Sequence, residues 1–106
     1  MARALINVPK AAKRGEVIEI RALISHPMES GFRPDSSGKL IPRSIIKQFV
    51  CAYDGEEIFR ADFFPAVAAN PFVSFTTLAS ASGTLSFTWV SDTGETQTET
   101  RPITVE

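Results

Sequence analysis

Hydrophobic and polar residues alternate along most of the chain with a period of two, which is typical of β-strands that are buried on one face only. The alternation is clearest over Thr84–Ser91 and is also present over Glu16–Ser25. We expect the apolar faces of these two segments to point into the core. They comprise Ile18, Ile20, Ala22 and Ile24 from one segment and Leu85, Phe87 and Trp89 from the other.

Turn signals divide the chain into about seven such segments. Asp54-Gly55 and Thr93-Gly94 are typical hairpin turns. No segment keeps a helical period, and the β-branched and aromatic residues that continue Arg43–Gln48 favour a strand over a helical turn. The pattern therefore predicts an all-β, antiparallel β-sandwich. Its expected strands are Arg3–Val8, Glu16–Ser25, Ser44–Tyr53, Glu56–Phe63, Phe72–Ala79, Thr84–Ser91 and Thr96–Val105.

Length and composition narrow the class of protein. The 106 residues predict one domain spanning residues 1–106. With 11 basic and 12 acidic residues the net charge is −1, so a strongly basic nucleic-acid binder is not expected. No apolar run approaches the roughly 20 residues that span a bilayer. The N-terminus lacks the apolar stretch of an export signal, so we expect a cytoplasmic protein or one exported while bound to a partner.

Charge is divided unevenly along the chain. Residues 1–53 hold nine basic and four acidic residues, whereas residues 54–106 hold two and eight. One interpretation is that strands from both halves interleave, so the asymmetry vanishes in the fold. The alternative is a positive patch near the loop His26–Arg43 that orients a partner.

Few residues suggest catalytic or metal chemistry. His26 is the only histidine and has no nucleophile-elbow motif nearby, so we expect a structural or partner-contacting role. Cys51 lies between apolar residues and is expected to be a buried thiol, with a disulfide to a partner as the alternative. Asp35 and Gly38 fit a turn better than a calcium loop. No nucleotide motif or cluster of metal ligands is present, so no cofactor is expected.

The connection His26–Pro42 is the longest in the predicted fold, at 17 residues. Loops of this length in a compact domain are often functional. The chain also holds eight phenylalanines, more than a small sandwich readily buries. An exposed group formed by Phe63-Phe64-Pro65 with Val67 would mark a protein interface.

The long loop contains His-Pro-Met-Glu-Ser-Gly-Phe-Arg-Pro-Asp at 26–35 and Gly-Lys-Leu-Ile-Pro-Arg at 38–43. Together these two stretches resemble the central motif of the SoxZ family of sulfur-oxidation proteins. The resemblance extends to Arg-Ala-Leu-Ile-Asn-Val-Pro at 3–9, Gly-Glu-Val-Ile-Glu-Ile-Arg at 15–21, Asn-Pro-Phe at 70–72 and Asp-Thr-Gly-Glu at 92–95. It therefore covers nearly the whole chain.

The resemblance implies an immunoglobulin-like sandwich that is not an enzyme and pairs with SoxY. In that family SoxY carries sulfur intermediates of thiosulfate oxidation on the cysteine of a C-terminal arm, and the pair is periplasmic, with SoxY supplying the export signal. Other Sox enzymes would act on the carrier transiently, and neither a nucleic acid nor a membrane is an expected partner. A stand-alone ligand-binding sandwich and a small His26-dependent hydrolase are the alternatives. The expected partner-binding residues are His26, Met28, Phe32, Arg33, Arg43, Phe63, Phe64 and Phe72.

Overall fold

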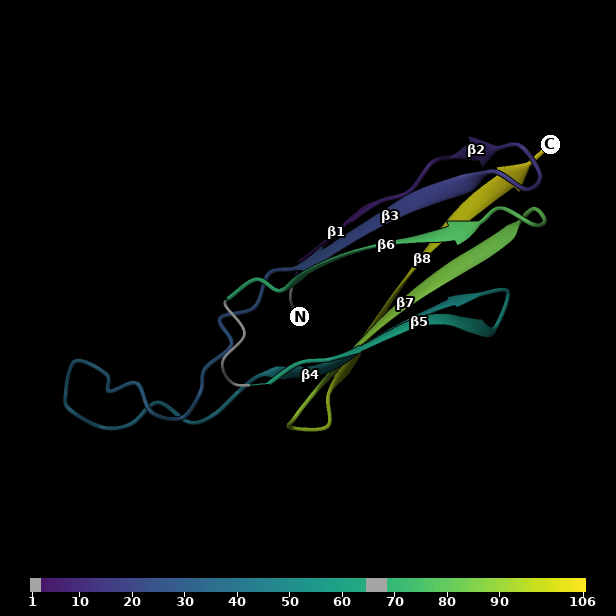
Figure 1. Cartoon of the computed structure of the whole chain (residues 1–106). Coiled ribbons are helices and arrows are strands. Elements are labelled where there is room, and N and C mark those ends of the chain that lie inside the picture. The colour runs from purple at the N-terminus through teal and green to yellow at the C-terminus, as the bar shows by residue number, and fades with distance from the viewer. Residues whose placement is uncertain (1–2, 65–68) are drawn as a thin grey trace.

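The computed structural model describes residues 3–64 and 69–106, and these residues form two layers of β-strands (Figure 1). All seven predicted strands are present, with ends that differ by up to two residues from the predicted ones. The strands are β1 (Ala4–Asn7), β2 (Ala11–Ala12), β3 (Val17–Ile24), β4 (Ile46–Tyr53), β5 (Glu56–Asp62), β6 (Phe72–Leu78), β7 (Gly83–Ser91) and β8 (Thr96–Val105).

The strands pair as a sandwich of the immunoglobulin type, as predicted. One sheet has the order β1-β3-β6 and the other has the order β2-β8-β7-β4-β5. The long pairings are all antiparallel, and only the two-residue β2 runs parallel to its neighbour β8. The sequence analysis missed β2 because two alanines carry no alternation to detect.

Aromatic side chains from both sheets fill the space between the layers. Trp89, Phe87 and Leu85 are at most 1% exposed, which confirms that they face the core. The ring of Phe49 lies 5.2 Å from that of Trp89, centroid to centroid. Burial of side chains of this size contributes roughly 1.5–3 kcal/mol each. The core therefore holds the two sheets together without help from a disulfide.

The predicted hairpin turn between β4 and β5 has the backbone that its residues require. Asp54 and Gly55 have φ of +49° and +84°, so both central residues are left-handed. This is typical of the type I′ turn, whose twist matches that of the flanking strands. At the second predicted turn, Gly94 has a φ of +92° and joins β7 to β8.

The connection between β3 and β4 leaves the sandwich at one end and projects beyond it (Figure 1). The molecule is elongated as a result, with principal extents of 57 × 20 × 19 Å. We call residues 29–44 the hairpin arm. The end of the sandwich from which it projects is also where β3 ends and β6 begins.

Candidate docking surface

The two limbs of the hairpin arm are joined by two isolated antiparallel bridges, Glu29 with Ser44 and Pro34 with Leu40. At the base of the arm, Glu29 and Ser44 exchange two backbone hydrogen bonds of 2.7 and 2.8 Å. Further out, the Ile41 N–H donates to the Arg33 carbonyl over 2.8 Å, and the Asp35 N–H donates to the Lys39 carbonyl over 2.7 Å. These backbone hydrogen bonds join the two limbs of the arm at its base and near its tip, which favours one shape while it extends into solvent.

The tip of the arm is a turn built on one carboxylate. Asp35 Oδ1 accepts hydrogen bonds from the Ser37 N–H at 2.8 Å, the Ser37 hydroxyl at 2.7 Å and the Lys39 N–H at 3.0 Å. The Ser37 hydroxyl and N–H hold the pKa of the Asp35 carboxyl below its ordinary value. Because this oxygen is already occupied by donors, the geometry fits the predicted turn.

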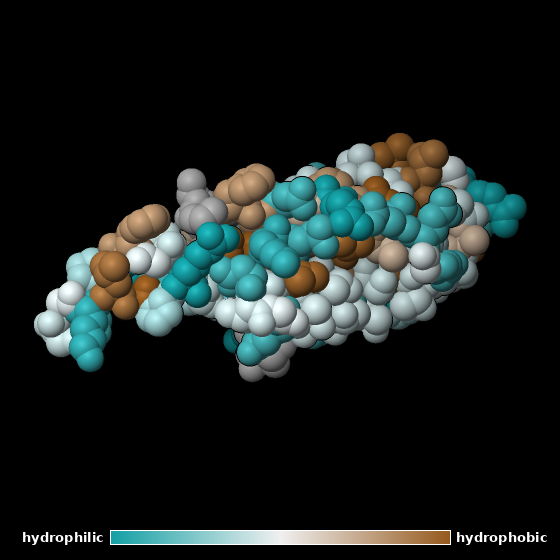
Figure 2. Space-filling model, turned by 90° about the horizontal axis from the view of Figure 1, so that it is seen from below, coloured by the Kyte–Doolittle hydropathy of each residue, from teal (hydrophilic) through white to brown (hydrophobic). Residues whose placement is uncertain are grey.

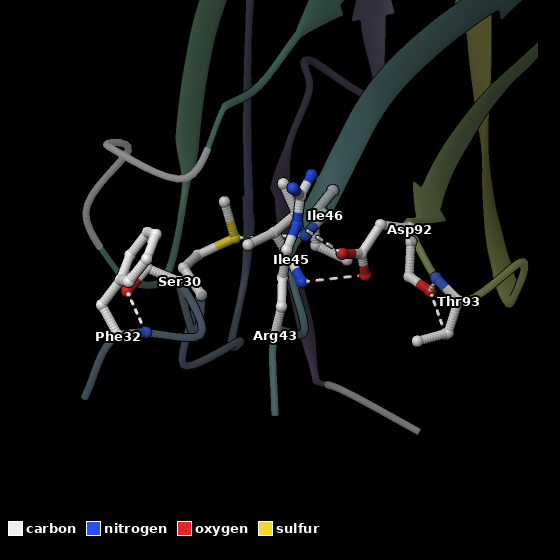
Figure 3. A network of polar contacts seen from close by, with 9 residues as sticks. Ser30, Phe32, Arg43, Ile45, Ile46, Asp92 and Thr93 are labelled. Atoms are coloured by element: carbon white, nitrogen blue, oxygen red, sulfur yellow. Dashed lines mark hydrogen bonds and ion pairs between the residues drawn. The ribbon is translucent and has the colours of Figure 1, made fainter. Parts of the chain in front are cut away.

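The root of the arm is tied to the β7–β8 turn by Asp92 (Figure 3). Asp92 accepts the Arg43 Nε–H at 2.9 Å and the Ile45 N–H at 3.1 Å, so one side chain holds both the last residues of the arm and the start of β4. Gly31 lies against Arg43, where an added Cβ would come within 3.3 Å of the Arg43 Cβ. Its φ of +91° also favours glycine there.

Met28 fixes the other limb of the root. Its side chain is 6% exposed, and its sulfur accepts the Ile46 N–H at 3.2 Å. The backbone reaches this position through a φ of +54° at Met28. Met28 was expected at the partner surface, but the structure places it in the core beneath the arm.

His26 lies just before the arm, in a network of backbone contacts. Its N–H donates to Asn70 Oδ1 at 2.9 Å, and the Asn70 N–H donates to its carbonyl at 2.7 Å. Its Nδ1 accepts the Met28 N–H at 3.0 Å. Partial burial lowers the pKa of the imidazole, and the negative charge of Asp92 acts in the opposite direction. His26 therefore joins the arm to the segment that leads into β6.

A pocket of about 250 Å³ opens beside His26. Ser44, Ser91 and Glu95 also line it, above a floor that includes Trp89. Among the described residues no serine or carboxylate is hydrogen-bonded to the imidazole, because Nδ1 is engaged by backbone and the Ser91 hydroxyl pairs with Thr93 at 2.6 Å. This arrangement gives the hydrolase alternative no support.

Two large apolar side chains stand in solvent on the arm. Phe32 is 81% exposed and Leu40 is 61% exposed. Leu40 forms a bridge with Pro34, and Phe32 lies two residues before Pro34 on the opposite limb of the hairpin. Figure 2 shows the resulting apolar residues on the projecting end, among hydrophilic ones. Leu40 was not among the residues expected at a partner surface, because exposure of a loop residue depends on the tertiary fold.

The phenylalanines that follow β5 divide into two roles. Phe64 is 66% exposed, whereas Phe63 packs against the core and its N–H donates to the Lys47 carbonyl at 2.8 Å. Pro65 and Val67, which were expected in the same exposed group, lie outside the described residues.

Phe72 lies on the outer face of the three-stranded sheet. It is 55% exposed and pairs in register with Leu23, which in turn pairs with Leu5. The three form an apolar row across the sheet at the end near the arm, a feature that single strands do not reveal. The predicted docking residues that are exposed therefore lie on two surfaces, one at the arm and one on the sheet.

The two arginines of the arm each form an ion pair with a carboxylate. Arg33 pairs with Glu29 through Nε at 3.1 Å and through its terminal nitrogen, and Arg43 pairs with Asp92. The hydrogen bond from Arg33 lowers the pKa of Glu29. Both arginines remain about half exposed, at 62% and 52% of their side chains. They offer oriented donors to a partner rather than a field of positive charge.

Cys51 is fully buried, as expected. Burial raises the pKa of its thiol to about 12, so the thiolate is not formed near neutral pH. Over the described residues no three His, Cys, Asp or Glu side chains gather where they could hold a metal ion. Nor does this part of the chain include a helix long and apolar enough to cross a membrane.

Solved structures of low sequence identity share the fold. A superoxide reductase (neelaredoxin) from Ignicoccus hospitalis aligns with a TM-score of 0.75 and 19% identity, over 99% of this chain and 82% of that one. The putative superoxide reductase of Thermotoga maritima gives 0.75 and 19%, over 97% and 85%. The sulfur carrier protein SoxY from Chlorobium limicola f thiosulfatophilum gives 0.69 and 15%, over 97% and 78%.

No curated protein matches the chain. The model of one protein family, described as sulphur oxidation protein SoxZ, matches residues 6–102. The match includes the whole hairpin arm and all strands except the ends of β1 and β8. The chain, whose loop motif already resembled this family, belongs to the SoxZ family and takes part in the Sox sulfur-oxidation system.

Proposed function

We propose that this protein is the non-catalytic subunit of a SoxYZ-type sulfur carrier and that it binds SoxY as a heterodimer. The family match is the observation that carries the proposal. SoxY would hold the covalent sulfur intermediates of thiosulfate oxidation on its own cysteine, and other Sox enzymes would visit the pair transiently. The pair would work in the periplasm, exported through the signal on SoxY.

The buried thiol of Cys51 supports this division of labour. A cysteine that carries a sulfur group must reach the active sites of several enzymes as a thiolate. Cys51 is fully buried in the middle of β4, and burial raises its pKa to about 12. It is therefore suited to packing, and the carrying cysteine belongs to the partner.

The hairpin arm is the surface that we assign to SoxY. Phe32 and Leu40 present apolar area at its sides, and Arg33 and Arg43 present oriented donors near its base. Aromatic and arginine side chains of this kind dominate the energetics of many interfaces. Backbone hydrogen bonds between its two limbs also favour one shape of the arm, which lowers the entropy lost on binding. Phe64, exposed at the same end of the sandwich, extends this surface.

Co-expression with SoxY followed by size-exclusion chromatography tests the proposal. The wild-type chain should co-elute with SoxY, and a chain that never does so would contradict the function itself. Phe32→Ser and Leu40→Ser should each weaken assembly, by about 2 kcal/mol or roughly 30-fold for an interface anchor.

The matched control is Leu78→Ser, which removes a side chain of similar exposure, 58%, from the far end of the molecule. It should leave SoxY binding unchanged. Equal losses in the arm and control variants would retain the family assignment and reject the arm as the docking surface.

A further inference from the structure

The free edges of the two sheets differ in how well they are protected. Unpaired edge strands are usually short, charged or interrupted by proline, because an open edge pairs readily with another strand. Four of the seven residues of β5 are charged, and β1 has only four residues, with Pro9 soon after. β8 carries Glu99, Arg101 and Pro102 along its open stretch, and β2 covers its end.

β6 lacks these features within its own seven residues, although Pro71 directly precedes it. Its sequence, Phe-Val-Ser-Phe-Thr-Thr-Leu, contains no charge and no proline, and its residues favour the strand conformation. On one side β6 pairs with β3 over the whole of its length. Along the other side no backbone hydrogen bond from any described residue is made. β6 is therefore the edge that is open to a further strand.

The outer face of the same sheet carries exposed apolar residues at both ends. At the end near the arm, Leu5, Leu23 and Phe72 form one row across the three strands. At the far end, Val17 and Leu78 form another row and are 62% and 58% exposed. The rows between them are polar, with Arg21 beside Ser74 and Glu19 beside Thr76.

We infer that β6 pairs antiparallel with β6 of a second copy of this chain, about a two-fold axis at Phe75. In this register Phe72 faces the partner's Leu78, and Ser74 faces the partner's Thr76. A shift of the pairing by one residue would set outer-face residues of one copy opposite core-facing residues of the other, so only every second register keeps the outer faces aligned. Among these registers, the one centred on Phe75 pairs all seven residues of β6. A two-fold interface is also the commonest kind in homo-oligomers.

This register matches like with like on the outer face. The apolar row of Leu5, Leu23 and Phe72 continues into the partner's Leu78 and the partner's Val17, so the apolar residues at each end of the face gain apolar neighbours in the same row. The polar row of Arg21 and Ser74 continues into the partner's Thr76. No like charges face each other across the new pair. This self-complementarity favours a second copy over an unrelated strand as the occupant.

The pairing is compatible with SoxY bound to the arm. Each arm leaves the sandwich at the end where β6 begins (Figure 1), so antiparallel pairing places the two arms at opposite ends of the dimer. The inference goes beyond the proposed function and does not depend on it, because β6 and its outer face belong to this chain alone.

Sedimentation equilibrium of the full chain without SoxY provides the first test. Its mass should rise from 11.6 kDa to twice that value as concentration increases. Thr76→Lys, at the centre of the edge, should weaken the dimer at least about tenfold, because two lysines would face each other diagonally across the pair. Thr100→Lys, the same change at an exposed position of β8, should not. A chain that stays monomeric up to its solubility limit, or equal effects of the two variants, would overturn the inference.

Cysteine cross-linking tests the register. Ser74→Cys combined with Thr76→Cys should give a covalent dimer on mild oxidation, since each new thiol would oppose one of the partner's at cross-strand distance. Cys51 is buried and should not react. The matched control, Thr98→Cys with Thr100→Cys on β8, should stay monomeric. Cross-linking by the control pair instead would overturn the inference. A third outcome is a wild-type chain that is monomeric alone and whose Thr76→Lys variant no longer binds SoxY. That outcome would assign the β6 edge to SoxY and would also overturn the inference.

Discussion

The sandwich and the hairpin arm are held by different forces. In the sandwich, aromatic and aliphatic side chains lose nearly all contact with water, as at Trp89 and Phe49. In the arm, backbone hydrogen bonds and exposed ion pairs fix the chain, while Phe32 and Leu40 point into solvent. Burial stabilises a fold, whereas exposed ion pairs contribute about 0–1 kcal/mol. The arm therefore adds little to the stability of the fold. This agrees with the role in partner docking that we propose for it.

This difference predicts that substitutions will separate into two classes. Changes in the core should alter the free energy of unfolding of the whole molecule. Changes in the arm should alter local order and partner binding while leaving the unfolding transition in place. Residues at the junction of the two regions should show an intermediate behaviour.

The largest effect is expected at Trp89, which is 1% exposed and lies against Phe49. Trp89→Ala should lower the free energy of unfolding by about 3–5 kcal/mol, enough to unfold a marginal domain. Chemical denaturation, monitored by circular dichroism, measures this loss of stability. In the wild-type protein, the fluorescence maximum should lie well to the blue of free indole and move to the red on unfolding. A native spectrum like that of free indole would contradict the core assignment.

A smaller effect is expected at Cys51, also fully buried. Cys51→Ser places a hydroxyl in an apolar site and should cost about 1–3 kcal/mol of stability. The thiol should resist alkylation in the native protein and react once the protein is unfolded. In a complex with SoxY, the variant should still support sulfur transfer. Complete loss of carrier function in a folded and assembled variant would show that Cys51 has a chemical role.

Most of the sandwich could be predicted from local pattern. Alternation placed Leu85, Phe87 and Trp89 correctly, and Asp54-Gly55 located a turn. The order of strands could not be obtained in this way, because pairing of β3 with β6 joins residues 49 to 61 positions apart. The exposed row of Leu5, Leu23 and Phe72 depends on that pairing and was therefore also hidden.

The candidate docking surface was predicted only in part. The length of the loop and its motif indicated the segment to which we assign the docking role, and Phe32 is exposed there. The burial of Met28 was not foreseen, since a φ of +54° turns its side chain beneath the arm. Phe63 and Phe64 are identical in type and adjacent, yet only Phe64 is strongly exposed, because Phe63 is held against the core by the bond from its N–H to the Lys47 carbonyl.

The junction should respond to loss of Asp92, which holds Arg43 and the Ile45 N–H. Asp92→Ala should cost about 1–2 kcal/mol, because it leaves a partly buried N–H without its side-chain acceptor. Arg43→Ala removes only the ion pair and should cost less than about 1 kcal/mol. Hydrogen exchange should show faster opening of the arm root in Asp92→Ala. An equal effect of both variants would mean that the ion pair, not the backbone contact, fixes the root.

The smallest effect on stability is expected at the tip of the arm. Asp35→Ala removes the acceptor for Ser37 and Lys39 but touches no residue of the sandwich, so the unfolding transition should stay where it is. The tip should instead become a site of proteolysis, because its turn has lost its organising side chain. Asp35→Asn keeps an oxygen at the same place and should retain the protection. Rapid cleavage of Asp35→Asn would show that the charge, rather than the turn geometry, holds the tip.

The same contacts make the order of the tip depend on pH. Hydrogen bonds from Ser37 lower the pKa of the Asp35 carboxyl in the folded arm, so the folded form binds a proton less readily than the unfolded one. Their contribution to local order is therefore complete above the ordinary pKa of aspartate and is lost as pH falls through the lowered value. An NMR titration should give a carboxyl midpoint below that of a free aspartate, with Ser37 and Lys39 amide shifts changing over the same range. A midpoint at the ordinary value would mean that the tip is not held by this carboxylate. In that case the arm, which carries Phe32 and Leu40, would be less well ordered than the sandwich.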